Sequence, residues 1–163
     1  MRDIAQVLMR SSQAQTDLRH FMKSQILFWL LAAPDGHAKN FSIQLKAGGS
    51  YAMAPLYDVL SVYPILGEGP NLVSPHKVKM AMAVRGKSPH WKMREILPRH
   101  WHELARRHGM ASTGADSPFE QVIDQTPAVI ETVKALLPLD FPAQVSESIL
   151  NGLAGAAKRF ASR

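Results

Sequence analysis

The spacing of apolar residues predicts helices in the first part of the chain. Apolar side chains recur there every three to four positions, which indicates helices at 2–10 and 17–32. Thr16 is the expected N-cap of the second helix, and Pro34 should end it because the residue before a proline avoids helical backbone angles. After Gln25 the second helix is apolar on all sides, so we expect its C-terminal half to be buried.

The spacing then changes from the helical period to a period of two. Phe41, Ile43 and Leu45 alternate with polar side chains, which predicts a half-buried strand. The glycine-containing segment 47–50 predicts a turn, and the alternation resumes at 51–53. The segment should therefore form a β-hairpin.

Prolines and glycines in the segment 61–75 predict an irregular loop. Beyond it the apolar spacing is again helical, and the helices predicted there are 76–84, 90–109, 117–136 and 142–160. Ser117 followed by Pro118 and Glu120 is a typical helix start, with an N-cap, a first-turn proline and a capping-box acid. These elements predict a mainly α fold, a single domain over residues 1–163 with one small β-hairpin.

The composition is that of a folded protein without disulfides. A chain of 163 residues can bury a proper core, and its 46% hydrophobic and 20% charged residues are ordinary for globular proteins. The absence of cysteine excludes a disulfide framework and a thiolate metal site, and suits a reducing compartment. No apolar run approaches the roughly 20 residues of a spanning helix, and the N-terminus lacks a secretory signal. We expect a cytoplasmic protein with no membrane partner.

Positive charge is concentrated in one part of the chain. The formal net charge is +6, and the segment 76–108 holds nine Lys and Arg residues but only two Glu. Trp91 and Trp101 are interleaved with them, so the segment is a candidate surface for DNA or for an acidic partner, with a solvated helical face as the alternative. The candidate contact residues are Lys77, Lys79, Arg85, Arg106 and Arg107.

Polar residues with the chemistry of a phosphotransfer site flank the predicted hairpin. A hairpin that turns at 47–50 places Asn40 opposite the mid-fifties, and therefore near Asp58. The side-chain oxygens of these two residues are hard ligands of the kind that Mg²⁺ takes. Asp35 lies on the tight loop that leads into the same place, where it could orient and deprotonate an attacking hydroxyl.

Two basic side chains complete this candidate site. His37 and Lys39 lie between Asp35 and Asn40, where they could supply positive charge near phosphates or hold the loop. Asp-Gly and Lys-Asn pairs are also common in turns, and Asp58 could cap a helix. The conjunction of a buried helix, a polar loop, a hairpin and a second aspartate favours the functional interpretation.

Several segments of the sequence resemble the C-terminal part of HipA proteins, which are bacterial serine/threonine kinase toxins of type II toxin–antitoxin systems. The similar segments are WLLAAPDGHAKNFSIQL, AGGSYAMAPLYDVLS, KVKMAM, PRHWHELARRHG and LPLDFP. The Asp-x-His-x-x-Asn loop also resembles that of phosphatidylinositol 3/4-kinases. The resemblance implies the helical C-lobe of a kinase-like fold, with Asp35 as catalytic aspartate and with Asn40 and Asp58 as Mg²⁺ ligands. It also implies ATP as phosphate donor, a protein hydroxyl as acceptor and a HipB-like DNA-binding antitoxin as partner, in a complex that binds operator DNA.

The sequence departs from the HipA pattern in one large respect. A HipA protein has an N-terminal lobe with a loop over the phosphates and a lysine for them, and no segment here matches those parts. We therefore expect a truncated gene product, an expressed fragment, or a split-kinase subunit that works with an N-terminal HipA-like subunit. Such a chain should be inactive in isolation. The alternative is a non-catalytic remnant that binds an antitoxin or DNA.

Overall fold

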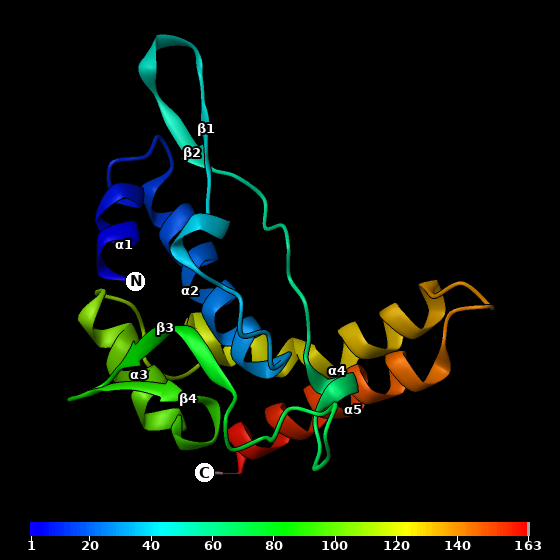
Figure 1. Cartoon of the computed structure of the whole chain (residues 1–163). Coiled ribbons are helices and arrows are strands. Elements are labelled where there is room, and N and C mark those ends of the chain that lie inside the picture. The colour runs from blue at the N-terminus through cyan, green and yellow to red at the C-terminus, as the bar shows by residue number, and fades with distance from the viewer. Residues whose placement is uncertain (163) are drawn as a thin grey trace.

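The computed structural model describes residues 1–162 as a mainly α fold with two separate pairs of antiparallel strands (Figure 1). The α-helices are α1 (Arg2–Leu8), α2 (Ala14–Leu30), α3 (Pro98–Arg107), α4 (Pro118–Leu136) and α5 (Ala143–Ala161). The strands are β1 (Ile43–Leu45), β2 (Tyr51–Met53), β3 (Lys79–Arg85) and β4 (Pro89–Lys92). Short 3₁₀ turns are η1 (Ala38–Asn40), η2 (Ala47–Gly49), η3 (Tyr63–Ile65) and η4 (Met93–Glu95).

Helix α2 is the central element, and it packs against α1, α4, α5 and β2. The predicted burial of its C-terminal half is confirmed, since Ile26, Phe28 and Leu30 are all buried. The helix begins at Ala14 rather than after Thr16, and Gln13 takes the N-cap position. A first turn that starts three residues earlier places Thr16 inside the helix instead of at its end.

Four aromatic side chains join the main helices in the core. Trp29 of α2 lies edge-on to Trp101 of α3 and to Phe160 of α5, with ring centroids 6.1 and 6.3 Å apart. Trp101 in turn packs on Phe119 of α4 at 5.2 Å. Such aromatic contacts bury large areas and favour tilted geometries of this kind. The cluster fixes α3, α4 and α5 around the end of α2.

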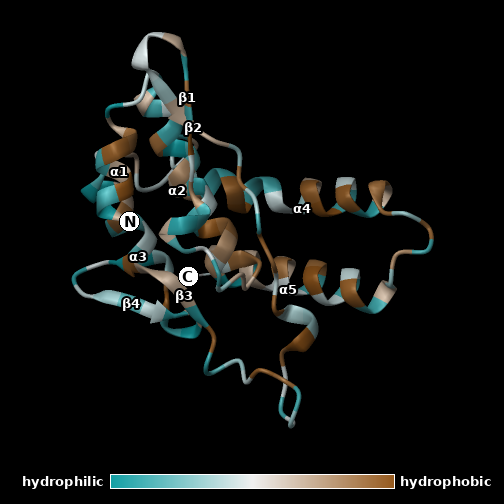
Figure 2. Cartoon of the chain, turned by 45° about the horizontal axis from the view of Figure 1, so that its top comes forward, coloured by the Kyte–Doolittle hydropathy of each residue, from teal (hydrophilic) through white to brown (hydrophobic). Residues whose placement is uncertain are grey.

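The two C-terminal helices confirm the prediction for 117–136 and 142–160. Ser117 caps α4 by accepting a hydrogen bond from the Glu120 N–H at 3.4 Å, with Pro118 in the first turn. The predicted capping-box role of Glu120 is wrong, since its carboxylate accepts from the Gly114 N–H at 2.6 Å while the Ser117 N–H donates to the Gly114 carbonyl at 2.9 Å. Helices α4 and α5 run as a projecting antiparallel pair whose far end carries apolar residues, including the 77% exposed Leu136 (Figures 1 and 2).

The predicted hairpin is present, but its expected half-burial is wrong for β1. Ile43 pairs with Met53 in an antiparallel register, and Gly48 and Gly49 adopt the positive φ angles that the turn requires. The hairpin projects from the helical body (Figure 1), and all three β1 residues are exposed, with Leu45 at 79%. The alternating pattern marked the two faces of the strand, yet α1 covers the Ile43 side only in part and leaves that residue 43% exposed.

The helix predicted over 76–84 and the first part of that predicted over 90–109 are wrong. This part of the chain forms the strands β3 and β4, so the fold contains a second antiparallel pair in addition to the predicted hairpin. The register shifts between Lys79 and Val84, and the buried residues Met80 and Val84 are four positions apart. An irregular strand thus reproduces the apolar spacing of a helix. Of the two helices predicted in this region, the structure keeps α3, which follows the short 3₁₀ turn η4.

Within residues 1–162, no helix is both long and apolar enough to cross a bilayer. The segment 61–75 is irregular, as predicted, apart from η3 and one bridge between Leu66 and Val73. This segment leads from the hairpin to β3 and passes close to the end of α2.

Candidate functional site

The loop that follows α2 carries the first candidate residues. It turns sharply after Leu31, because Ala32 has a positive φ of 47° and the Ala33 N–H donates back to the Phe28 carbonyl at 2.8 Å. Gly36 lies directly against the ring of Phe28, and a Cβ at this position would overlap the ring atoms. The loop can therefore approach the helix this closely only with glycine at position 36.

Asp35 and His37 contact each other at the surface of this loop. The Nδ1 atom of His37 lies 2.5 Å from Oδ1 of Asp35, and the side chains are 48% and 49% exposed, respectively. The His37 N–H also donates to the Asp35 carbonyl at 2.8 Å. The Asp35 carboxylate is thus oriented by the imidazole and remains open to a molecule from solvent, as a residue that receives a proton from an acceptor hydroxyl must be.

Asn40 and Asp58 meet as the sequence predicts. The Asn40 Nδ2 atom donates to Oδ2 of Asp58 at 3.0 Å. Asn40 is only 6% exposed, whereas Asp58 is exposed. Asp58 has a φ of 55°, in the left-handed region that few residues other than glycine adopt. Strained backbone of this kind is concentrated at functional sites, where the surrounding structure holds it in place.

The free oxygen of Asn40 fits a metal ligand. Its Oδ1 atom is buried and has no hydrogen-bond partner among the described residues. A buried carbonyl oxygen without a partner is destabilising by about 1–3 kcal/mol, and a bound cation would remove that penalty. Asn40 and Asp58 provide a neutral and a negative oxygen ligand, the kind of partial set that Mg²⁺ completes with water and phosphate oxygens. No group of three His, Cys, Asp or Glu in the described part of the chain forms another candidate metal site.

Asp17 positions the hairpin that brings Asn40 and Asp58 together. This buried carboxylate accepts hydrogen bonds from the Gln13 amide at 2.8 Å and from the Met53 N–H at 2.9 Å. Burial raises the pKa of Asp17, but its hydrogen bonds outweigh that effect and leave the pKa below its ordinary value. Sequence reasoning missed Asp17, because an acid in a first helical turn is common and nothing local reveals a partner 36 positions away.

A hydrogen bond between Tyr57 and Lys39 is a second contact across the hairpin. The Tyr57 hydroxyl donates to the Lys39 carbonyl at 3.2 Å and lies 2.8 Å from the Ser42 hydroxyl. The Lys39 side chain is exposed. The backbone of Lys39 therefore holds the site together, while its amino group is open to solvent next to Asn40.

The segment after Asp58 is tied to the end of α2 by three hydrogen bonds. Ser61 Oγ donates to the Leu31 carbonyl at 2.6 Å, and the Val62 N–H donates to the Ala32 carbonyl at 3.1 Å. The Tyr63 hydroxyl donates to the carbonyl of Leu30 at 3.0 Å. These carbonyls directly precede the Asp35 loop. The Asp35 loop and the segment after Asp58 are therefore anchored to the same stretch of backbone at the end of α2.

The basic candidates are exposed but do not form one compact cluster. Lys79 and Arg85 occupy opposite ends of β3, on the order of 20 Å apart at the usual rise of a strand. Arg106 and Arg107 both pair with Glu103, at 3.0 and 3.3 Å. Lys77 lies in the turn before β3.

Of the two tryptophans predicted to lie at the basic surface, one is exposed and the other is not. Trp101 is fully buried in the core, so it cannot contact nucleic acid and its prediction is wrong. Its position among basic residues in the sequence did not show that its side of α3 faces inward. Trp91 on β4 is 47% exposed and is the aromatic residue that remains available at this surface.

Comparisons with known proteins identify the family of the chain and agree with its fold. A family model described as the HipA-like C-terminal domain matches residues 1–131. Among solved structures, the chain is similar to HipA of Shewanella oneidensis MR-1 in its complex with HipB and operator DNA, with a TM-score of 0.75 and 16% sequence identity. The match covers 97% of this chain and 35% of that HipA chain. At this identity the likeness shows the fold, and the chain spans about a third of that protein's length.

Proposed function

The chain belongs to the family of HipA-like C-terminal domains, and we propose that it is the catalytic and Mg²⁺-binding lobe of a HipA-like serine/threonine protein kinase. The observation that carries the proposal is the contact between Asn40 and Asp58, which leaves a buried Asn40 oxygen without a partner among the described residues, beside the Asp35 loop. Phosphoryl transfer uses this set of groups: an aspartate for the acceptor hydroxyl, and an asparagine and an aspartate for the metal ions.

Asp35 acts on the acceptor. Its exposed carboxylate accepts the proton of a serine or threonine hydroxyl, and His37 holds the carboxylate in one orientation. The rigid turn between Phe28 and Gly36 fixes the backbone of this loop, so little reorganisation is needed when an acceptor binds.

Asn40 and Asp58 would hold the metal. The Nδ2 donor of Asn40 satisfies one carboxylate oxygen of Asp58, and this leaves Oδ1 of Asn40 as a ligand. A bound Mg²⁺ would neutralise the charge of the ATP phosphate oxygens. Lys39, which is exposed, adds positive charge on the same loop, and His37 supports the loop through its contact with Asp35.

The family and the compared structure support a proposal for the partners. The similar Shewanella oneidensis protein was solved with HipB and operator DNA. We propose that this chain acts within a type II toxin–antitoxin system in the cytoplasm, with a HipB-like antitoxin as partner and operator DNA bound through the complex. The match covers only 35% of the compared HipA chain. An N-terminal HipA-like lobe supplies the remaining contacts to ATP.

Paramagnetic broadening by Mn²⁺ tests the metal site directly. In the wild-type chain, Mn²⁺ added in the presence of ATP should broaden the NMR signals of residues 36–40 and 57–59 before any others. Asn40→Ala and Asp58→Ala should abolish this selective broadening. Asp124→Asn, which removes an exposed carboxylate on α4, is the matched control and should leave it unchanged. Broadening that is centred elsewhere, or that persists in Asp58→Ala, would overturn the assignment.

A further inference from the structure

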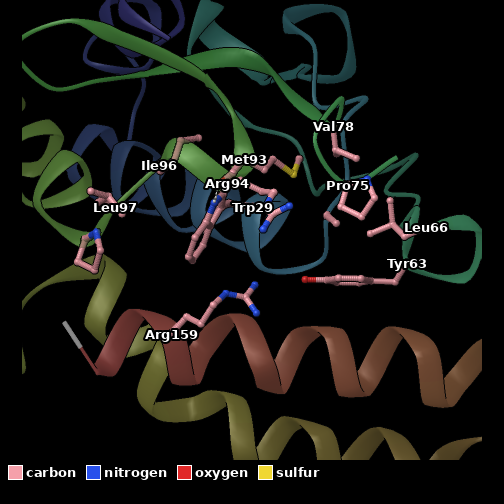
Figure 3. A pocket seen from close by; sticks show the side chains of 12 residues that line it. Trp29, Tyr63, Leu66, Pro75, Val78, Met93, Arg94, Ile96, Leu97 and Arg159 are labelled. Atoms are coloured by element: carbon pink, nitrogen blue, oxygen red, sulfur yellow. Dashed lines mark hydrogen bonds between the residues drawn. The ribbon is translucent and has the colours of Figure 1, made fainter. Parts of the chain in front are cut away.

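A cavity of about 480 Å³ opens between the end of α2, η3, the connection from η4 to α3, and α5 (Figure 3). Its walls are largely apolar and include Trp29, Leu66, Val78 and Ile96. The Trp29 indole is held in place because its Nε1–H donates to the Met93 carbonyl at 2.9 Å. None of the residues assigned above to phosphotransfer lines this cavity.

Two arginine side chains bring positive charge to this apolar space. Arg94 of η4 and Arg159 of α5 both line the cavity, and Figure 3 shows their guanidinium groups pointing into the space between Trp29 and Tyr63. Within residues 1–162, neither guanidinium has a carboxylate within 4.0 Å. The polar neighbour of Arg94 is His76, whose Nε2 atom lies 2.8 Å from the guanidinium and does not neutralise it. Two like charges that face the same cavity repel each other, and a bound anion would remove this repulsion.

Tyr63 gives the cavity a fixed polar wall. Its ring packs directly on Gly152 of α5, where a Cβ would come within 2.6 Å of the ring atoms. Its hydroxyl donates to the Leu30 carbonyl at 3.0 Å and points toward Arg159 (Figure 3). Burial raises the pKa of Tyr63, and Arg159 offsets only part of that rise, so the phenol stays neutral and brings no negative charge to the arginines.

We propose that this cavity binds a small anionic molecule with a carboxylate or phosphate group on an aromatic or aliphatic body. Arg94 and Arg159 hold the oxyanion, because the planar guanidinium donates paired hydrogen bonds to such groups. Trp29 and the aliphatic side chains beside it take the apolar body. The volume falls within the range of about 300–1,000 Å³ that is usual for small-molecule sites, and a mostly apolar lining with a few converging polar groups is typical of them.

An NMR titration of the full chain tests this proposal. The probes are phenyl phosphate and benzoate, with benzyl alcohol as the neutral analogue, and the readout is the Trp29 Nε1–H signal. We expect a saturable shift of this signal with at least one anionic probe, at least tenfold weaker binding of benzyl alcohol, and an unchanged indole signal from Trp91, which does not line the cavity. The anion that binds with the higher affinity identifies whether the site prefers phosphate or carboxylate.

Substitution of the arginines decides between anion recognition and apolar adsorption. The double variant Arg94→Gln/Arg159→Gln should bind the anionic probe at least tenfold more weakly than wild type. Arg10→Gln, an exposed arginine that does not line the cavity, is the matched control and should bind like wild type. The absence of a saturable shift, equal binding of benzyl alcohol, or an equal loss in Arg10→Gln would each overturn the proposal.

Discussion

Asn40 and Asp58 are eighteen positions apart in the chain, and their side chains are joined by a hydrogen bond of 3.0 Å. The β1–β2 hairpin produces this contact, since the Ala54 N–H still donates to the Ser42 carbonyl at 2.8 Å beyond the last strand residue. From there the chain reaches Asp58, whose positive φ of 55° accompanies the approach of its carboxylate to Asn40. The hairpin therefore closes the candidate site although it projects from the helical body.

Gly36→Ala should displace the Asp35 loop. The added Cβ overlaps the ring of Phe28, which is itself buried, so the loop must move away from α2. We expect a loss of about 1–3 kcal/mol in the free energy of unfolding, as for other overpacked sites, together with loss of the Mn²⁺ effect at Asn40. Urea unfolding and the Mn²⁺ titration measure the two consequences.

Gly155→Ala is the matched control for this substitution. Gly155 lies inside α5, and a Cβ there makes only an ordinary contact at 3.5 Å with the end of Arg159. Alanine is the better helix former, so this variant should be as stable as wild type or more stable by up to about 1 kcal/mol. Equal stabilities of the Gly36→Ala and Gly155→Ala variants would refute the close approach of the loop to Phe28.

Asp17→Asn should remove part of the pH dependence of stability. The pKa of Asp17 is depressed in the folded chain, so its stabilising contribution is present above the unfolded pKa of about 3.9 and is lost as pH falls through the folded value. At pH 7 the free energy of unfolding of the variant should be about 1–3 kcal/mol lower than that of wild type. The reason is that an amide NH₂ replaces the oxygen that accepts the Gln13 or Met53 hydrogen bond. Near pH 3 the difference from wild type should narrow.

Denaturant unfolding from pH 3 to pH 7 measures this effect. Asp124→Asn changes an exposed carboxylate on α4 and serves as the control, with no expected change in the pH profile. A stability profile of Asp17→Asn that runs parallel to that of wild type would show that Asp17 does not tie the hairpin to α2.

Glu103→Gln tests whether the end of α3 binds nucleic acid. Glu103 pairs with both Arg106 and Arg107, and its removal frees two guanidinium groups. If this surface binds DNA, affinity should rise in Glu103→Gln and fall when both arginines are changed to Glu. The slope of log affinity against log salt should become steeper by about 0.9 for each additional phosphate that the protein neutralises, and shallower by the same amount for each one fewer. Fluorescence anisotropy with a duplex at several salt concentrations provides the measurement.

Glu131→Gln is the control with the same change of net charge. Glu131 pairs with Lys134 on α4, outside the basic segment. An equal rise in affinity in Glu103→Gln and Glu131→Gln would attribute binding to net charge alone. Absence of binding at low salt would assign the segment to a solvated surface.

Local chemistry made some elements predictable from the sequence. The start of α4 follows from Ser117 and Pro118, which act within one helical turn. The meeting of Asn40 and Asp58 was predictable because a short hairpin turn fixes which residues lie opposite each other. Both predictions depend on residues close in sequence or joined by a single turn.

The features that the sequence did not reveal depend on distant partners. Strand β3 contains two Met, two Ala, one Lys and one Arg, all of which favour helices, and pairing with β4 overrides that preference. The exposure of Leu45 depends on which elements surround the hairpin, and an alternating pattern does not carry that information. The hydrogen bond from Met53 to Asp17 joins elements that no local motif connects.

The central claim is that Asp35 acts on the acceptor hydroxyl in phosphoryl transfer. The most direct measurement is Mg²⁺-dependent transfer of the labelled γ-phosphate of ATP to protein, by this chain mixed with the N-terminal lobe of a HipA protein. We predict no detectable transfer by the chain alone, transfer by the mixture, and a loss of at least roughly 10²-fold in Asp35→Asn, with Asp124→Asn unchanged. Transfer by the mixture that survives Asp35→Asn would contradict the account.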